Sequence, residues 1–230
     1  MQTFPAINAA RTETRQRLLE AAGEVFAERG FRNTTIREIC RRAQANLAAV
    51  NYHFGDKERL YAAVMEYAQA CALEKYPLAQ GESSDIPAAE RLQAFIRYLL
   101  FSIFDKGAPA WLGKIMAREM IEPTSALDTL VERIIRPMAQ KLGAIVRELL
   151  EVPVPDEGVH RCQMSIIGQC LHYRNARPVI QRIFPQQHYT PEDIKAMAEH
   201  ITRFSLSALR GLTTGEEDKK GRQEEKGSGR

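Results

Sequence analysis

The chain has 230 residues, of which 44% are hydrophobic and 27% are charged, a balance typical of an ordinary globular protein. Its formal net charge of +3 permits a nucleic-acid partner without requiring one, because the local field matters more than the total charge. The most apolar run, residues 98–104, is far too short to span a bilayer, and residues 1–10 carry no signal-peptide pattern, so we expect a cytoplasmic location and no membrane partner.

The cysteines lie inside apolar helical patterns and have neither a paired nor a Cys-x-x-Cys spacing. They are Cys40, Cys71, Cys162 and Cys170. This usage is typical of reduced core thiols. We predict no metal site and no cofactor.

Helical hydrophobic periodicity runs through nearly the whole chain, and no alternating strand pattern competes with it. The first helix carries an apolar face that consists of Leu18, Ala22, Val25 and Phe26. It ends at Gly30, and the spacing of Thr35 and Glu38 predicts a capping box at the start of a second helix. A very short helix is predicted over 47–53, and a longer one over 56–76.

The polar, breaker-rich segment 77–87 interrupts this series of helices. Beyond it the periodicity predicts helices over 87–106, 110–122, 124–151, 157–174 and 191–212. Pro137 falls inside the third of these and is expected to kink it. Residues 213–230 are charged and glycine-rich, and we expect them to be disordered because they cannot bury enough apolar surface. The fold class expected is all-α.

Residues 34–54 read as two short helices joined by a three-residue turn. Helices this short are not stable alone, so Ile36, Ile39, Val50 and Phe54 are expected to pack on the first helix. A three-helix unit of this kind can insert its last helix into the major groove of DNA. The outward face is uncharged and slim, and it consists of Asn46, Leu47, Ala48, Ala49, Asn51 and Tyr52. Basic side chains available for phosphates surround it, namely Arg32, Arg37, Arg41, Arg42 and Lys57. The alternative is a small helical hairpin with a solvated basic face.

Residues 11–61 closely resemble the DNA-binding domain of the TetR/AcrR family. The matching strings are LLEAAGEVFAERGF, TTIREI, YHF and KERL, in the family's order. The resemblance implies a dimeric regulator, usually a repressor, that binds double-stranded DNA at a pseudo-palindromic operator. It also implies that a small-molecule effector binds the C-terminal domain. The domains expected are a helix-turn-helix domain at 1–60, a helical effector-binding and dimerisation domain at 61–212, and the disordered tail.

The resemblance also implies roles for single residues. Thr35 and the N-terminus of its helix would hold a phosphate, Arg37 would lie nearby, and residues 46–51 would face the bases. Tyr52, His53 and Lys57 would touch the DNA backbone. Two positions depart from the family pattern and belong to the same expected site, Gln44 and Asn51. The family usually has glycine at the first, so Gln44 is expected to tolerate an awkward backbone. It usually has an aromatic residue at the second, where the amide of Asn51 could pair with adenine.

The C-terminal half resembles the CecR-type domain of this family, through the strings at 118–137 and 168–180. That subgroup is tied to responses to antibiotics and other toxic compounds, which makes export or drug-sensitivity genes plausible targets. A ligand pocket usually combines large apolar side chains with a few charged or polar groups. The residues predicted to line it are Phe101, Phe104, Trp111, Ile115, Met116, Arg118, Glu119 and Tyr173. The alternative for this set is a methionine-rich core.

Helix 157–174 is apolar on two sides, with a small polar stripe between them. We expect the stripe and one face of the final helix to form the dimer interface, through Ser165, Gly168, Gln169, His172, Ile201, Phe204 and Ala208. Simple core packing is the alternative for the final helix. A helical metal-binding protein or enzyme on the same fold is the other class considered. The sequence has no phosphate-binding loop and no nucleophile elbow, so an enzyme is not expected.

Overall fold

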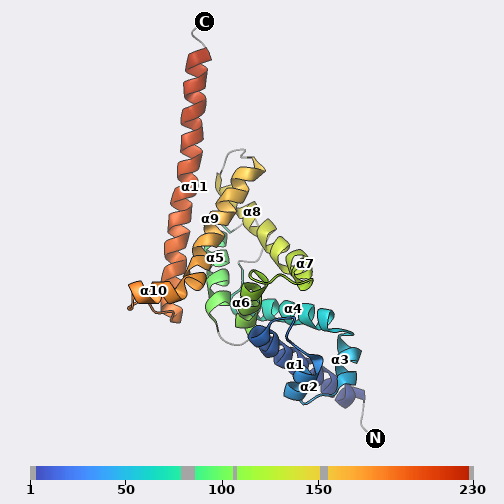
Figure 1. Cartoon of the computed structure of the whole chain (residues 1–230). Helices are drawn as coiled ribbons and strands as arrows, with labels where there is room; N and C mark the ends of the chain where they lie inside the picture. The colour runs from blue at the N-terminus through green and yellow to red at the C-terminus, as the bar shows by residue number, and fades with distance from the viewer. Residues whose placement is uncertain (1–3, 79–85, 106–107, 151–154, 228–230) are drawn as a thin grey trace. The chain divides into compact units, whose positions relative to one another are not determined.

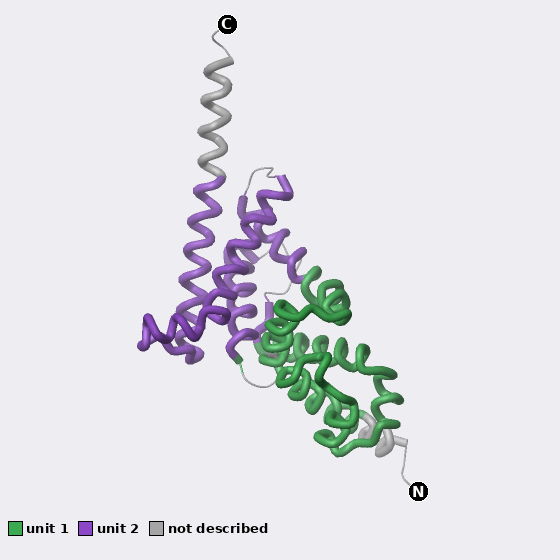
Figure 2. The backbone as a smooth tube through the Cα atoms, in the orientation of Figure 1, with its two compact units in different colours: residues 1–75, 105–137 green, residues 76–104, 138–230 purple. Residues whose placement is uncertain are grey.

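The computed structural model describes residues 4–78, 86–105, 108–150 and 155–227, with the side chains of 4–11, 109 and 213–227 outside the description. Within these residues every regular element is helical, as the sequence predicted (Figure 1). The chain forms two compact units (Figure 2). Unit 1 comprises residues 1–75 and 105–137, and unit 2 comprises residues 76–104 and 138–230.

Unit 1 contains α1 (Phe4–Arg29), α2 (Ile36–Ala43), α3 (Leu47–His53), α4 (Lys57–Lys75), α6 (Ala108–Glu119), α7 (Ala126–Leu130) and the π-helical turn η1 (Val131–Ile135). Its core forms where α1 packs against α2, α3, α4 and α6. The apolar face predicted for α1 is confirmed, because Leu18, Ala22, Val25 and Phe26 are completely buried. Ile39 from α2 and Val50 from α3 are buried in the same core, so the two short helices are held by α1.

Unit 2 contains α5 (Ala88–Phe104), α8 (Arg136–Leu150), α9 (Asp156–Asn175), α10 (Arg177–Ile183) and α11 (Pro191–Gly227). Its core forms where α5 packs against α9 and α11. Completely buried side chains come from four helices, for example Leu92 of α5, Val146 of α8, Cys170 of α9 and Ala198 of α11. Burial raises the pKa of the Cys170 thiol to about 12, which keeps it protonated. All four cysteines are free thiols, but only Cys40 and Cys170 are buried, whereas Cys71 and Cys162 are half-buried.

One helical path leads from α7 through η1 into α8, where the sequence predicted a kinked helix. Pro137 has no N–H to donate to the carbonyl of Arg133, and its ring crowds that carbonyl. The π-helical turn lies directly before it, and the backbone N–H of Arg136 donates to the carbonyl of Val131, five residues back. The irregularity expected at Pro137 is therefore a widened turn, and the division between the two units falls at the same residue.

The two compact units divide the chain differently from the expected boundary at residue 60, which falls inside α4. The segment 108–137 joins unit 1 because Trp111, Leu112 and Ile115 pack into the core around α1 and α4. The division into compact units does not test which residues bind DNA or an effector, so DNA binding by 1–60 and effector binding by 61–212 stay predictions.

The end of the chain shows two further differences. Helix α10 was not predicted. The structure continues α11 to Gly227, where the sequence predicted disorder from residue 213; side chains beyond Leu212 lie outside the description, so that prediction stays untested. In the part of the chain that the structure describes, no helix is both long and apolar enough to cross a bilayer.

Candidate nucleic-acid interface

The helix-turn-helix begins with a side-chain cap on α2. The backbone N–H of Glu38 donates to the hydroxyl of Thr35 at 3.3 Å, which is half of the predicted capping box. The other half is missing because the Glu38 carboxylate accepts hydrogen bonds from Arg41, at 2.8 and 3.2 Å. That hydrogen bond is the main cause of the lowered pKa of Glu38.

The turn between α2 and α3 is tight at Gln44. This residue has φ 50° and ψ 45°, and among the described residues it is the one non-glycine residue with positive φ. A side chain in this left-handed region costs about 1–2 kcal/mol relative to ordinary backbone, which is why the family has glycine there. The awkward backbone expected at Gln44 is confirmed. Its side chain is exposed beside α3.

Helix α3 is capped by Asn46, whose side-chain oxygen accepts from the backbone N–H of Ala49 at 2.8 Å. The exposed part of its surface consists of Asn46, Leu47, Ala48, Asn51 and Tyr52, with Leu47 51% and Tyr52 64% exposed. Large apolar groups this exposed on a seven-residue helix form a surface suited to a partner. The outward placement of Ala49 is wrong, because Ala49 is half-buried and packs against the core of unit 1.

The basic side chains around α3 differ in their exposure and in the groups that they contact. Arg37 is exposed, and Lys57 lies 4.5 Å from the centre of the Phe31 ring. Burial lowers the pKa of Lys57, and the nearby Glu58 opposes this effect. His53 is half-buried at the end of α3.

Two arginines expected to be available for phosphates are ion-paired instead. Arg42 donates to both carboxylate oxygens of Glu28, at 3.0 and 2.6 Å, and Arg41 pairs with Glu38. The hydrogen bond from Arg42 is the largest cause of the lowered pKa of Glu28, so the pair stays ionised. Arg32 donates to the carbonyl of Pro123 at 3.3 Å. Sequence spacing could not show the pair of Arg42 with Glu28, because Glu28 comes from α1, whereas Arg41 and Glu38 lie three residues apart on α2.

The structure adds a residue that the sequence did not single out. The Arg15 guanidinium lies 5.4 Å from the centre of the Phe54 ring. Arg15, His53 and Arg59 line a groove of about 370 Å³ within unit 1. This places two further arginines beside the end of α3, one of them from the first helix.

Comparison with known proteins identifies this arrangement. Residues 18–64 match the family described as bacterial regulatory proteins, tetR family. Residues 88–209, more than half of the chain, match the family described as HTH-type transcriptional dual regulator CecR, C-terminal domain. The chain belongs to the TetR family.

Two named relatives match over nearly their whole length. The HTH-type transcriptional dual regulator CecR of Shigella flexneri is 27% identical over 217 residues, which cover 91% of this chain and 97% of that protein. The HTH-type transcriptional repressor NicS of Pseudomonas putida is 39% identical over 212 residues, which cover 86% and 92%. The protein is thus a DNA-binding transcriptional regulator of the TetR family with a CecR-type C-terminal domain.

Solved structures of low identity share the TetR fold. FadR from Bacillus subtilis in complex with stearoyl-CoA gives a TM-score of 0.61 at 17% identity, covering 84% of this chain and 97% of that one. HlyIIR, a hemolysin II transcriptional regulator, gives 0.56 at 20% identity, covering 84% and 98%. At these identities the likeness concerns the fold alone.

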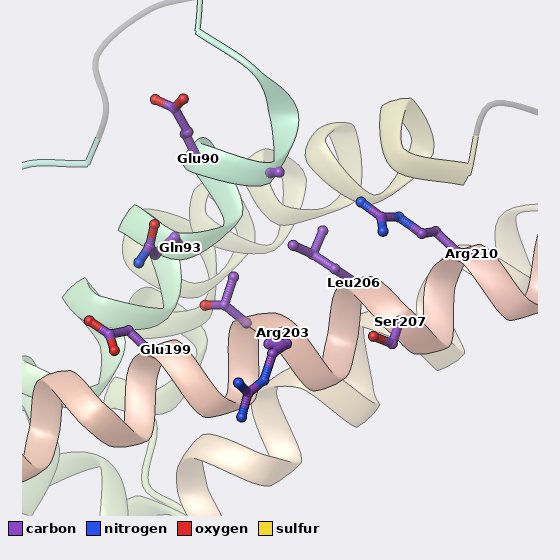
Figure 3. Close-up of a pocket in the computed structure, with 9 residues that line it drawn as sticks. Glu90, Gln93, Glu199, Arg203, Leu206, Ser207 and Arg210 are labelled. Atoms are coloured by element: carbon purple, nitrogen blue, oxygen red, sulfur yellow. The ribbon is translucent and has the colours of Figure 1, made fainter.

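The residues predicted to line a ligand pocket in this TetR-family chain do not gather in one unit. Trp111, Ile115, Met116, Arg118 and Glu119 belong to unit 1, and Phe101, Phe104 and Tyr173 belong to unit 2. None of the eight lines the groove beside His53 or the groove between α5 and α11 that Figure 3 shows. The pocket stays a prediction, and its unit 1 members have structural contacts of their own.

Arg118 and Glu119 were expected to offer charge to a ligand, but both are used inside unit 1. Arg118 donates to the carbonyls of Ala27 and Glu28, which are left open at the end of α1. Glu119 is 2% exposed and accepts a hydrogen bond of 2.8 Å from the Tyr61 hydroxyl. Burial, with this bond second, raises the pKa of Tyr61 far above its ordinary value. Arg118 therefore links α6 to α1, and Glu119 links α6 to α4.

The predicted dimer residues are mostly exposed. Ser165, Gly168, His172, Phe204 and Ala208 are exposed, with Phe204 at 58%. Gln169 is half-buried and donates to the Ser205 hydroxyl at 3.4 Å. The prediction that Ile201 lies in the dimer interface is wrong, because Ile201 is 1% exposed and packs in the core of its own unit. Met164, which is 62% exposed on α9, was not among the predicted interface residues, because the interface on this helix was assigned to its small polar stripe.

A groove of about 330 Å³ lies between α5 and α11 in unit 2 (Figure 3). Glu90 and Gln93 line it from α5, and Glu199, Arg203 and Arg210 line it from α11. Its lining carries both signs of charge, so it favours neither an anion nor a cation. Among the described residues, no group of three or more His, Cys, Asp or Glu could hold a metal ion.

Proposed function

We propose that this TetR-family regulator is a homodimeric repressor that binds a pseudo-palindromic operator and releases it when a small molecule binds. The observation that carries the proposal is the exposed, uncharged face of α3 beside two capped helix starts. Such a face can approach base edges closely, while the helix starts and the surrounding cations position it on the phosphates.

The proposed contacts are those that the resemblance to the family implies for side chains on and around α3. Thr35 and the N-terminus of α2 hold a phosphate, and Tyr52, His53 and Lys57 contact the backbone. Asn51, which is exposed, pairs with an adenine through its amide. Asn46 contributes through its cap, which fixes the first turn of α3. Arg37 is the exposed cation on α2 for a neighbouring phosphate.

Repression and effector release rest on the relatives. NicS of Pseudomonas putida and AcnR of Corynebacterium glutamicum are named repressors, whereas CecR is named a dual regulator. FadR, which shares the fold, was solved with stearoyl-CoA. These names support a small-molecule effector for this chain without identifying it. A regulator of this kind works where the DNA is, in the cytoplasm, and performs no catalysis.

Dimerisation is proposed through the exposed faces of α9 and α11. A Cβ on Gly168 would meet nothing within 4 Å, so a second backbone can approach there. Met164 and Phe204 provide apolar area that a single chain leaves exposed. Two-fold symmetry of this interface would match the two-fold symmetry of the operator.

Replacing Asn51 tests base recognition. Asn51→Ala is expected to cost about 1–3 kcal/mol at one base position of the operator and little at the others, because it removes one paired amide. Lys57→Ala should instead weaken binding to all sequences alike and reduce the salt slope by about one. Fluorescence anisotropy on single-base variants of the DNA flanking its own gene measures both. An unchanged base preference in Asn51→Ala would refute base reading by this residue.

Replacing Phe204 tests the interface. Phe204→Glu is expected to weaken the dimer by about 3 kcal/mol, or roughly a hundredfold, because it replaces an aromatic group that the interface would bury with a charged one. Lys195→Glu places a glutamate at an exposed position about two and a half turns earlier on α11, on the opposite side of the helix, and should have no effect. Sedimentation velocity over a range of concentrations compares them. Equal dimer stability in both variants would place the interface elsewhere.

A further inference from the structure

Tyr189, in the connection between α10 and α11, has a buried hydroxyl with no hydrogen-bond partner among the described residues. A polar group buried in this way costs about 1–3 kcal/mol and calls for an explanation. The neighbouring Thr190 differs, because its N–H and hydroxyl both donate to Asp193, at 2.9 and 2.7 Å. The missing partner is therefore particular to Tyr189.

The ring of Tyr189 has two close partners. It stacks on Phe104 at the end of α5, with ring centres 4.7 Å apart and planes 22° apart. The Arg177 guanidinium lies over the same ring, 4.7 Å from its centre. Tyr173 of α9 packs against the same core. Burial is the largest cause of the raised pKa of Tyr189; the charge of Arg177 lowers this pKa, and electrostatic interaction with Tyr173 raises it. The Tyr189 ring thus contacts both an aromatic ring and a cation.

The segment that carries Tyr189 is weakly attached to unit 2. Helix α10 has no buried residue, and its apolar side chains Val179, Ile183 and Phe184 are each more than half exposed. In Figure 1, α10 lies between the end of α9 and the start of α11. A segment with so few buried contacts opens at lower free energy than the helices around it.

We propose that Tyr189 occupies an effector site, and that an aromatic carboxylate binds there by displacing it from Phe104. The ligand ring takes the place of the Tyr189 ring on Phe104, and its carboxylate binds Arg177. No ion pair of Arg177 is found among the described residues, and a guanidinium binds a carboxylate more strongly than the face of a ring. This inference rests on the proposed ligand-responsive function.

Displacement makes a quantitative prediction. Where a site is open for only a fraction of the time, the apparent association constant equals the intrinsic one multiplied by that fraction. Tyr189→Ala removes the competing ring and leaves Phe104 and Arg177 in place. The full-length variant should therefore bind benzoate at least tenfold more tightly than the wild type, measured by calorimetry without DNA. Benzamide has the same ring without the charge and should gain much less.

Control variants locate the site. In the Tyr189→Ala background, Arg177→Gln should lose the gain for benzoate, whereas Arg203→Gln, in the groove between α5 and α11, should keep it. Loss on changing Arg203, equal gains for both probes, or no gain at all would each overturn the proposal. DNA binding without ligand is measured separately on the same proteins, so a failure of operator binding is distinguished from a failure of this site.

A conservative variant keeps the test decisive if Tyr189→Ala does not fold. Tyr189→Phe retains the stacked ring and removes only the unpaired hydroxyl. Its melting temperature should be equal to or above that of the wild type, because no hydrogen bond is lost. A melting temperature several degrees lower would mean that the hydroxyl has a partner, and the inference would lose its starting point.

Discussion

Gly23→Ala is expected to lower the free energy of unfolding by about 2–3 kcal/mol, although alanine ordinarily stabilises a helix. A Cβ at this position of α1 would lie 2.1 Å from Cε3 and 2.4 Å from Cζ3 of Trp111. The indole is 9% exposed and belongs to the core of unit 1, so it has little room to move. The absence of a side chain at Gly23 is what lets α6 pack closely on α1.

Gly211→Ala is the matched control, because a Cβ at that position on α11 meets nothing within 4 Å. It should stabilise the protein by about 0.5–1 kcal/mol. Urea unfolding followed by circular dichroism measures both variants. Trp111→Leu should recover part of the loss when combined with Gly23→Ala, and two alanine variants of equal stability would contradict the close approach of α6 and α1.

Glu119→Ala is expected to cost about 3 kcal/mol of stability. Its carboxylate accepts hydrogen bonds from the Tyr61 hydroxyl at 2.8 Å and from the backbone N–H and hydroxyl of Thr124, each at 2.9 Å. Removing it leaves a buried hydroxyl and a partly buried N–H without their acceptor, and each such group costs about 1–3 kcal/mol. Tyr61→Phe removes one donor and leaves the other bonds, so its cost should be near 1 kcal/mol.

Glu122→Ala provides the control, because Glu122 is an exposed acid three residues further along the chain. It should change stability by less than about 0.5 kcal/mol. The urea concentrations at the midpoints of unfolding compare the stabilities of the two variants, provided that their m-values are equal. If Glu119→Ala and Glu122→Ala had the same midpoint, the buried carboxylate would not be the link between α4 and α6.

The sequence was most informative where a local pattern of residues is compatible with only one structure. The period of Leu18, Ala22, Val25 and Phe26 predicted a buried helix face, and these residues are completely buried. Capping side chains are local features, so the helix-turn-helix could be located to within a residue or two. The unusual backbone at Gln44 was expected from the family resemblance, because the family usually has glycine at this position.

The sequence was least informative about which elements pack together. The pattern of Trp111, Arg118 and Glu119 fits a ligand pocket and a core equally well, since periodicity gives the apolar face of a helix but not its neighbour. Ile201 lies in the core and Phe204, one turn later, is exposed, because α11 is apolar on more than one side. Helix α10 gave no periodic signal because it has no buried face to repeat.

The ion pairs of α2 affect how the protein searches a chromosome. Attraction to DNA of arbitrary sequence comes almost entirely from cations that displace counterions from phosphates. Arg42 is bound to Glu28 and Arg41 to Glu38, so each must exchange one anion for another before it contributes. A protein with few uncommitted cations spends less time on the many unrelated sites that compete with its operator. Discrimination is then gained by weakening the wrong complexes, without any stronger contact in the right one.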